Sequence, residues 1–219
     1  MVAAKPLLAA ALIGLVSTST ALAAIVDAPT VRITSADQAK ARTALLRRED
    51  LGAGWLGGPI KTSPLSPPDC PGFDPKESDL VVTGHADARY TTPGFELDQD
   101  VQVMKNEADV QTDFARSVSP RLSKCLAYQL AKLKNVLAVR VVRMPFPPTG
   151  SVSAVYRAVL EVQTPRGRGT LLSDYVFFGQ GRVEYEFTLI APLGARDQLT
   201  KFEQGLAQIL LRRAGTGTA

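Results

Sequence analysis

The sequence predicts an α+β fold: an antiparallel sheet of about six strands with helices packed on one face. Several segments alternate apolar and polar residues, which is the pattern of a strand with one buried face. Short turns join these segments, and short connections favour antiparallel pairing. Segments with helical spacing precede and follow them. The composition, 45% hydrophobic and 21% charged, is that of a globular protein.

Residues 1–23 have the layout of a secretory signal peptide. Lys5 gives a positive start, Leu7 to Val16 form an apolar core, and Ala21-Leu22-Ala23 provides a small-residue cleavage site. The alternative is an N-terminal anchor helix, but the apolar run is short for a membrane span. We therefore expect the mature chain to be secreted or otherwise extracytoplasmic, with no transmembrane segment.

The mature chain is expected to form one domain over 35–213, between a flexible leader at 24–34 and a flexible tail at 214–219. Its first helix is predicted to begin with a capping box of Ser35 and Gln38 and to continue through the RRED segment. A cluster of glycines around the single tryptophan ends this helix.

Two strands are predicted next, at 80–92 and 95–105, joined by a Pro-Gly turn. A helix over 106–118 follows. Pro120 interrupts the helical pattern, which resumes over 121–133, so either a kinked helix or two consecutive helices would fit.

The remainder of the chain predicts four strands and a closing helix. The strands are placed at 136–144, 151–164, 170–178 and 182–191. The helix spans residues 194–212, and its apolar stripe consists of Leu199, Phe202, Leu206, Ile209 and Leu210.

Two cysteines, Cys70 and Cys125, are predicted to form a disulfide, because paired cysteines in an oxidising compartment are usually joined. Closing a loop of this length stabilises a fold by about 4 kcal/mol in the chain-entropy model. Cys70 lies in an irregular loop with six prolines between Pro59 and Pro75, so the bond would tie this loop to the domain. Neither cysteine has a His or Cys neighbour at metal-ligand spacing.

The charges are divided unevenly along the chain. Residues 24–115 carry nine Lys and Arg against fifteen Asp and Glu, whereas residues 116–219 carry fifteen against six. The basic half could attract an anionic surface, such as phospholipid headgroups or wall polymers. Alternatively, the two halves fold together and largely neutralise each other.

Candidate catalytic residues are scarce. His85 is the only histidine, and strand alternation places it on one face with Asp87 and Arg89. The chain has no G-x-S-x-G motif, so we interpret His85 as a solvent-exposed strand residue. Acidic residues at alternate positions of the next strand, among them Asp98 and Asp100, are interpreted as a polar solvent face.

No catalytic residue, metal ligand or cofactor is therefore predicted. The chain has no dinucleotide or phosphate-loop motif, and no interleaving of aromatic and basic residues that would suggest nucleic-acid binding. A secreted hydrolase that uses His85 and a carboxylate remains as an alternative function. A structural, wall-associated protein held by its basic half is a third.

Aromatic residues gather in the last strands and the closing helix, where an incompletely closed interface would leave an apolar cleft. Arginines at its edge would favour an amphipathic ligand with an anionic head, such as a lipid. Complete interdigitation would instead give a dry core with no site. The predicted ligand-binding residues are Tyr156, Arg157, Arg182, Tyr185, Phe187, Phe202 and Leu206.

Four segments carry a family resemblance: LLRREDLGAGW (Leu45–Trp55), FARSVSPRLSKCL (Phe114–Leu126), AVYRAVLEVQT (Ala154–Thr164) and GRVEYEFTLIAP (Gly181–Pro192). They resemble the extracellular sensor domain of mycobacterial serine/threonine kinase H and related actinobacterial secreted proteins. The resemblance implies a sheet backed by kinked helices and a cleft for an unidentified extracellular ligand. The kinase sensor domain has two disulfides where this chain can form one, so no functional residue is carried over.

These observations together predict a secreted, non-catalytic domain of the cell envelope. It would bind a small apolar or amphipathic ligand, or an envelope component, in the manner of a sensor domain.

Overall fold

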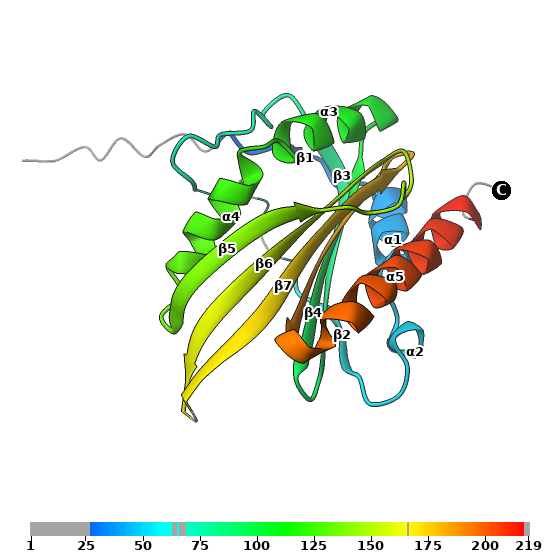
Figure 1. Cartoon of the computed structure of the whole chain (residues 1–219). Coiled ribbons are helices and arrows are strands. Elements are labelled where there is room, and N and C mark those ends of the chain that lie inside the picture. The colour runs from blue at the N-terminus through cyan, green and yellow to red at the C-terminus, as the bar shows by residue number, and fades with distance from the viewer. Residues whose placement is uncertain (1–26, 63–64, 66–68, 166, 217–219) are drawn as a thin grey trace, which may run out of the picture.

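The computed structural model describes residues 27–62, 65, 69–165 and 167–216. They form one eight-stranded sheet with helices on both faces (Figure 1). The strand order is β1-β3-β4-β8-β7-β6-β5, and β2 also pairs with β3. All pairs are antiparallel except β1 with β3. The strands are β1 Thr30–Val31, β2 Leu56–Ile60, β3 Val81–Thr92, β4 Phe95–Met104, β5 Val136–Met144, β6 Val152–Thr164, β7 Gly167–Gln180 and β8 Val183–Pro192.

The α+β class and the mostly antiparallel sheet are confirmed, but the sheet has more strands than the six expected. The six predicted strands correspond to β3–β8, whereas β1 and β2 were not predicted. β1 lies within the expected leader and has only two residues. β2 contains Gly57, with φ of 118°, where a Cβ atom would lie 2.1 Å from the Arg89 carbonyl oxygen. Glycine permits this close approach. Because glycine is unfavourable within strands, a prediction based on residue propensities misses β2.

The helices are α1 Ser35–Thr43, α2 Arg48–Leu51, α3 Glu107–Ser117, α4 Leu122–Ala131 and α5 Arg196–Thr216. The single first helix that we predicted is divided into α1 and α2. Thr34 caps α1, since its hydroxyl accepts the Asp37 N–H, and the Gln38 side chain donates to the His85 carbonyl instead of completing a capping box. A break at Pro120 separates α3 from α4, which is the two-helix alternative. α5 continues to Thr216, into the expected tail.

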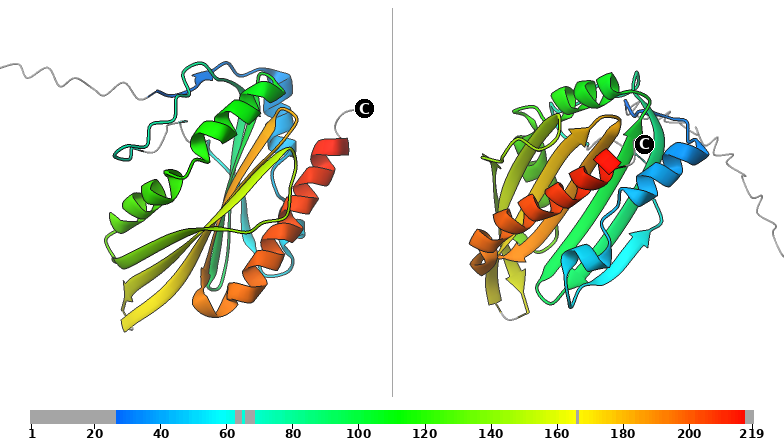
Figure 2. Two further views of the ribbon diagram at one scale, coloured as in Figure 1. Left: turned by 45° about the horizontal axis from the view of Figure 1, so that its top comes forward. Right: turned by 90° about the vertical axis from the view of Figure 1, so that its right-hand side faces the viewer.

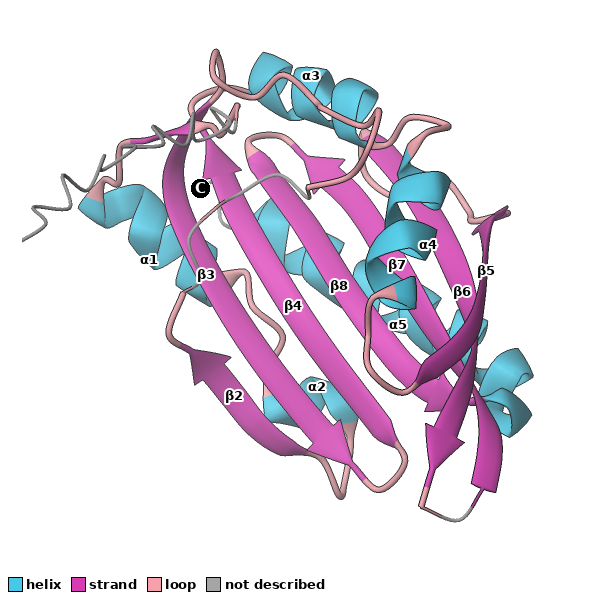
Figure 3. Ribbon diagram, turned by 90° about the vertical axis from the view of Figure 1, so that its left-hand side faces the viewer, coloured by secondary structure: helices cyan, strands magenta, loops and turns pink. Residues whose placement is uncertain are grey.

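Helices cover both faces of the sheet, so the prediction of helices on one face was wrong. α1, α2 and α5 lie on one face (Figure 2, right), and α4 lies on the other with α3 near the end of the strands (Figure 3). β7 shows the reason. Its Val176 and Phe178 belong to the core on the α5 face, whereas Phe177 packs in the α4 cluster. A strand with apolar side chains on both faces of the sheet requires packed elements over both faces.

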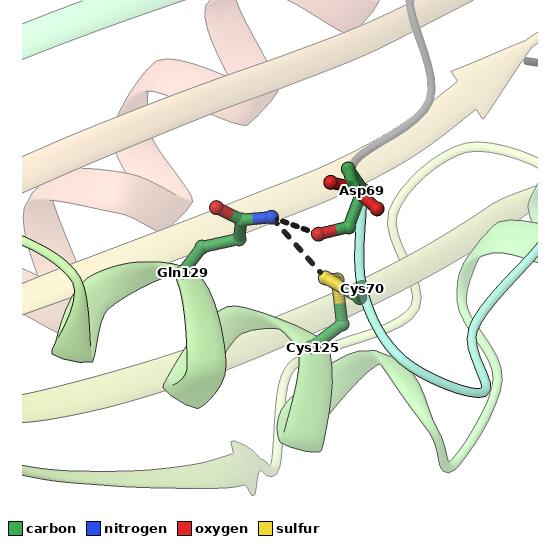
Figure 4. The surroundings of a disulfide bond; sticks show 4 residues. All are labelled: Asp69, Cys70, Cys125 and Gln129. Atoms are coloured by element: carbon green, nitrogen blue, oxygen red, sulfur yellow. Dashed lines mark hydrogen bonds between the residues drawn. A yellow bond between two sulfur atoms is a disulfide. The ribbon is translucent and has the colours of Figure 1, made fainter. Parts of the chain in front are cut away.

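The Cys70–Cys125 disulfide is confirmed and joins the proline-rich loop to α4 (Figure 4). The two Cα atoms are 5.3 Å apart, within the usual range. The Gln129 side-chain amide donates to the Asp69 carbonyl beside the bond. A small core of Phe73, Val118, Leu122 and Tyr156 surrounds the two cysteines, so the loop is packed against the domain as well as bonded to it.

No helix among the described residues is long and apolar enough to cross a membrane. The predicted signal peptide, residues 1–23, lies outside the described residues.

Candidate functional site

The interface between α5 and the late strands, where we predicted a cleft, is a packed core. Tyr185, Phe187 and Leu206 are at most 1% exposed. Phe202 stacks on the ring of Trp55, with centroids 5.9 Å apart. Tyr156 lies on the other face of the sheet, in the cluster under α4. The predicted ligand-binding residues therefore do not form one site. The interface between α5 and the late strands is the fully interdigitated core that we considered as the alternative to a cleft.

The two predicted arginines do not edge an open groove. Arg157 is only 3% exposed and donates through Nε and Nη2 to the Asp174 carboxylate under α5. Arg182 donates to the Met104 carbonyl and to the Asp37 carboxylate. Both guanidinium groups thus hold elements of the fold together.

A cavity of about 550 Å³ lies between α1 and the C-terminal end of α5, and Tyr185 contributes to its wall. Two of the charged residues in its wall form ion pairs within the protein: Asp37 with Arg182, and Arg213 with Asp50. Lys40 and Arg47 also line this cavity, so its wall carries more cations than carboxylates.

A second cavity, of about 410 Å³, lies on the opposite face of the sheet, under α3 and α4. Its lining has two chemically distinct sides. Apolar side chains come mainly from α4, the disulfide-bonded loop and the strand ends: Leu65, Phe73, Leu80, Met104, Val118, Leu122, Leu126 and Phe177. The polar side chains are His85, Gln102, Ser117 and five acidic residues: Glu77, Asp100, Asp113, Glu184 and Glu186.

Strand register brings three acidic residues of this lining, Asp100, Glu184 and Glu186, together, with Asp87 beside them outside the lining. Asp87, Asp100 and Glu186 are directly opposite one another on β3, β4 and β8. His85 and Glu184 occupy the neighbouring row, both opposite Gln102. Like charges directly opposite each other destabilise a sheet, so this arrangement has a cost that some other interaction must offset.

His85 lies inside this acidic cluster, and its interpretation as a solvent-exposed residue was wrong. The side chain is 8% exposed, and its Nε2 atom lies 2.5 Å from Asp100 Oδ2 and 3.1 Å from Asp87 Oδ1. Burial alone would lower the pKa of His85, but the hydrogen bonds and charges of Asp100 and Asp87 raise it to about 9. The imidazole is therefore a buried cation at neutral pH.

Burial raises the pKa of the carboxyl groups around the cavity, and their mutual repulsion raises it further. The pKa of Glu186 reaches about 8 through burial and the charges of Asp100 and Asp113. The pKa of Glu77 also reaches about 8, and that of Glu184 is raised well above its ordinary value. The cavity thus holds carboxyl groups that an approaching cation would ionise and stabilise.

His85, Asp87 and Asp100 could also hold a metal ion, since they offer one ligand atom each and these atoms lie within 4.8 Å of one another. The same atoms form the ion-pair cluster described above, and a metal ion would have to displace the ring proton in order to bind there. In the described part of the chain, the ring hydrogen-bonds to carboxylates and not to a hydroxyl or thiol nucleophile.

No protein-family model, curated protein or solved structure matches this chain. The assignment of a function therefore depends on the cavity and its lining.

Proposed function

We propose that this protein is an exported, non-catalytic binding domain of the cell envelope that holds a small amphipathic ligand in the cavity under α3 and α4. The predicted signal peptide supports export, and the Cys70–Cys125 bond suits an oxidising compartment. A ligand-binding domain with a cleft is also what the resemblance to the kinase sensor domain implies.

The two-sided lining of the cavity carries the proposal. The apolar side, with Leu122, Leu126 and Phe177, would accept a hydrocarbon or ring system. The acidic side, with Glu184 and Glu186, would accept a cation or a group with several hydrogen-bond donors. Ligand sites are commonly apolar pockets with a few convergent polar groups.

The acidic lining of the cavity favours a cationic group on the ligand, whereas the sequence led us to expect an anionic headgroup. The neighbours with the largest effects on the pKa of Glu184 are all carboxyl groups. An anionic ligand would add to this repulsion, whereas an ammonium or guanidinium group would relieve it. The ligand class is therefore a small amphipathic cation.

Calorimetry with two probes of equal chain length tests the charge preference. Decylammonium and decanoate, each below its critical micelle concentration, are titrated into the protein. We expect decylammonium to bind at least ten times more tightly. Its affinity should increase from pH 6 to pH 8.5, because binding displaces protons from carboxyl groups whose pKa is near 8.

A double variant, Glu184→Gln with Glu186→Gln, should remove most of the preference for decylammonium. Glu96→Gln with Glu107→Gln is the matched control, since neither residue lines the cavity. Equal binding of the two probes would contradict the proposal. Binding of Zn²⁺ or Mn²⁺ that disappears in His85→Ala, without decylammonium binding, would favour a metal site instead.

Export is tested separately by fusing residues 1–34 to a phosphatase that is active only outside the cytoplasm. Activity in intact cells is the expected result, and activity confined to the lysed cytoplasmic fraction would contradict export.

A further inference from the structure

The surface at the end of α4 and the start of β5 combines exposed apolar side chains with cations. Leu133 is 54% exposed, Leu137 49% and Tyr128 42%. Lys132 and Lys134 between them are also exposed. We call these five residues the basic tip. It contains three of the eight large apolar side chains that are strongly exposed in the described part of the chain.

Hydrogen bonds and packing hold the basic tip in place. The Leu133 N–H donates to the Leu130 carbonyl and the Val136 N–H to the Leu133 carbonyl, both at 3.1 Å. Leu130 and Val136 pack inward in a cluster with Leu160. Since the inward positions of this turn are already filled, the exposed leucines are presented to the surroundings by the fold.

The charge around the basic tip is mainly positive. From residue 114 to residue 160 the chain contains eight Lys and Arg and no Asp or Glu. Arg121 and Lys124 are exposed at the start of α4, the end away from the basic tip, and Arg140 is exposed on β5. The neighbouring strand β6 contributes one exposed carboxylate, Glu161. The Lys132 ammonium lies 4.0 Å from the centroid of the Tyr128 ring, so cation and aromatic face are adjacent.

We propose that the basic tip docks this protein on the surface of an anionic phospholipid bilayer. Charge complementarity selects an anionic occupant, which argues against a second copy of this positively charged surface. The exposed leucines select a bilayer over a dissolved polyanion, because apolar side chains enter the headgroup boundary while lysines remain among the headgroups. A tyrosine at the same level suits the interface.

Docking through the basic tip leaves the cavity lining in place. Leu122 and Leu126 line the cavity from the inner side of α4. Arg121, Lys124 and Tyr128 are exposed on the same helix. The proposal is therefore independent of what the cavity binds.

Vesicle sedimentation tests the proposal. Vesicles of phosphatidylcholine alone, or with 30 mol% phosphatidylglycerol, are mixed with the full chain and with the chain from residue 24 onward. We expect binding to the anionic vesicles that weakens at least tenfold between 50 mM and 300 mM NaCl, and little binding to phosphatidylcholine alone. Because every variant shares the same N-terminal segment, differences between variants report on the basic tip.

Two double variants separate the apolar and charged contributions. Leu133→Ser with Leu137→Ser should weaken vesicle binding at least fivefold while leaving binding to heparin, a soluble polyanion, unchanged. Lys132→Glu with Lys134→Glu should weaken both. The matched controls are Leu56→Ser with Ile60→Ser on β2, and Lys61→Glu with Lys105→Glu, all at exposed positions.

Equal losses in the control variants would overturn the proposal. So would unchanged vesicle binding in the leucine variant, which would identify a binder of soluble polyanions. If the serine variant does not fold, Leu133→Trp provides a second measurement. Its fluorescence should shift to the blue on addition of anionic vesicles, relative to the background of Trp55, and no shift would equally overturn the proposal.

Discussion

His85 illustrates how far the role of a single residue depends on its surroundings. The sequence places it correctly on one strand face with Asp87, and the structure adds Asp100 from the paired strand. Two carboxylates beside one ring nitrogen convert an ordinary imidazole into a buried cation. The positive charge of His85 therefore partly neutralises the carboxylates around it.

We predict that His85 titrates near pH 9 and that Asp100→Asn lowers its pKa, because this change removes the closer of the two carboxylates. His85 is the only histidine, so its proton resonances identify it directly in an untagged protein. Arg89→Gln is the control, since Arg89 pairs with Asp98 outside the cluster. A pKa near 6.5 in the wild type would show that the ion pairs do not form.

Arg157 and Glu203 are both buried beneath α5, at 3% and 1% exposure, but their charge states differ. Arg157 is ionised and satisfied by Asp174. Burial, and then the neighbouring Asp174, raises the pKa of Glu203 to about 10, so this carboxyl is protonated.

We predict that Arg157→Ala destabilises the protein by about 3–5 kcal/mol, because it leaves the buried Asp174 charge without its partner. Glu203→Gln should change stability by less than about 1 kcal/mol, since it replaces one neutral group with another. Urea denaturation measures both. Similar losses in the two variants would contradict this assignment of charges.

At the scale of elements, the proline-rich loop and α4 form one unit. The disulfide and the core around Phe73 and Leu122 fix the loop against the helix, and this unit supplies about half of the apolar side of the cavity. The cavity therefore depends on a covalent bond as well as on packing.

We predict that Cys70→Ser with Cys125→Ser lowers the free energy of unfolding by about 4 kcal/mol, from the chain-entropy cost of a 55-residue separation. Decylammonium binding should weaken in parallel, because Phe73 and Leu122 lose their fixed positions. Thermal denaturation with and without reductant provides the measurement. A variant with unchanged stability would indicate that packing alone holds the loop.

At the scale of the whole molecule, helices on both faces create two different interiors. The α5 face is a packed and mainly apolar core that encloses the Arg157–Asp174 ion pair and Glu203, whereas the α3–α4 face combines apolar side chains with His85 and carboxyl groups around a cavity. The second interior provides the candidate site.

We predict that the folded protein loses stability as pH rises from about 5 to 9. The pKa values of Glu77 and Glu186 are raised to about 8, so between about pH 4.5 and 8 the folded state binds more protons than the unfolded state. His85, with a pKa of about 9, acts in the same direction above pH 6.5.

Thermal denaturation across this pH range tests the expectation. Glu77→Gln with Glu186→Gln should flatten the profile and raise the melting temperature at pH 8, since each unit of pKa shift corresponds to about 1.4 kcal/mol. A melting temperature that rises with pH in the wild type would contradict the burial of these groups.

The sequence by itself determined the secondary structure of the central strands and the disulfide. The alternation of apolar and polar residues in β4 and β8 is a local signal, and two cysteines allow one pairing. The resemblance to the kinase sensor domain, the signal peptide and the ligand-binding function stay predictions. The short β1 and β2 were missed, because two residues, or a glycine-rich run, carry no periodicity.

Only the tertiary structure decided which side of each strand forms a site. Local alternation distinguishes two faces, but it does not say which face meets a helix, and here both do. The acidic row joins Asp87 to Glu186 through Asp100, across about a hundred residues of chain. Register between distant strands sets such proximity, and no local pattern contains it. For this reason the predicted site residues are divided between the two faces of the sheet, most of them beneath α5, and the cavity under α3 and α4 was not predicted.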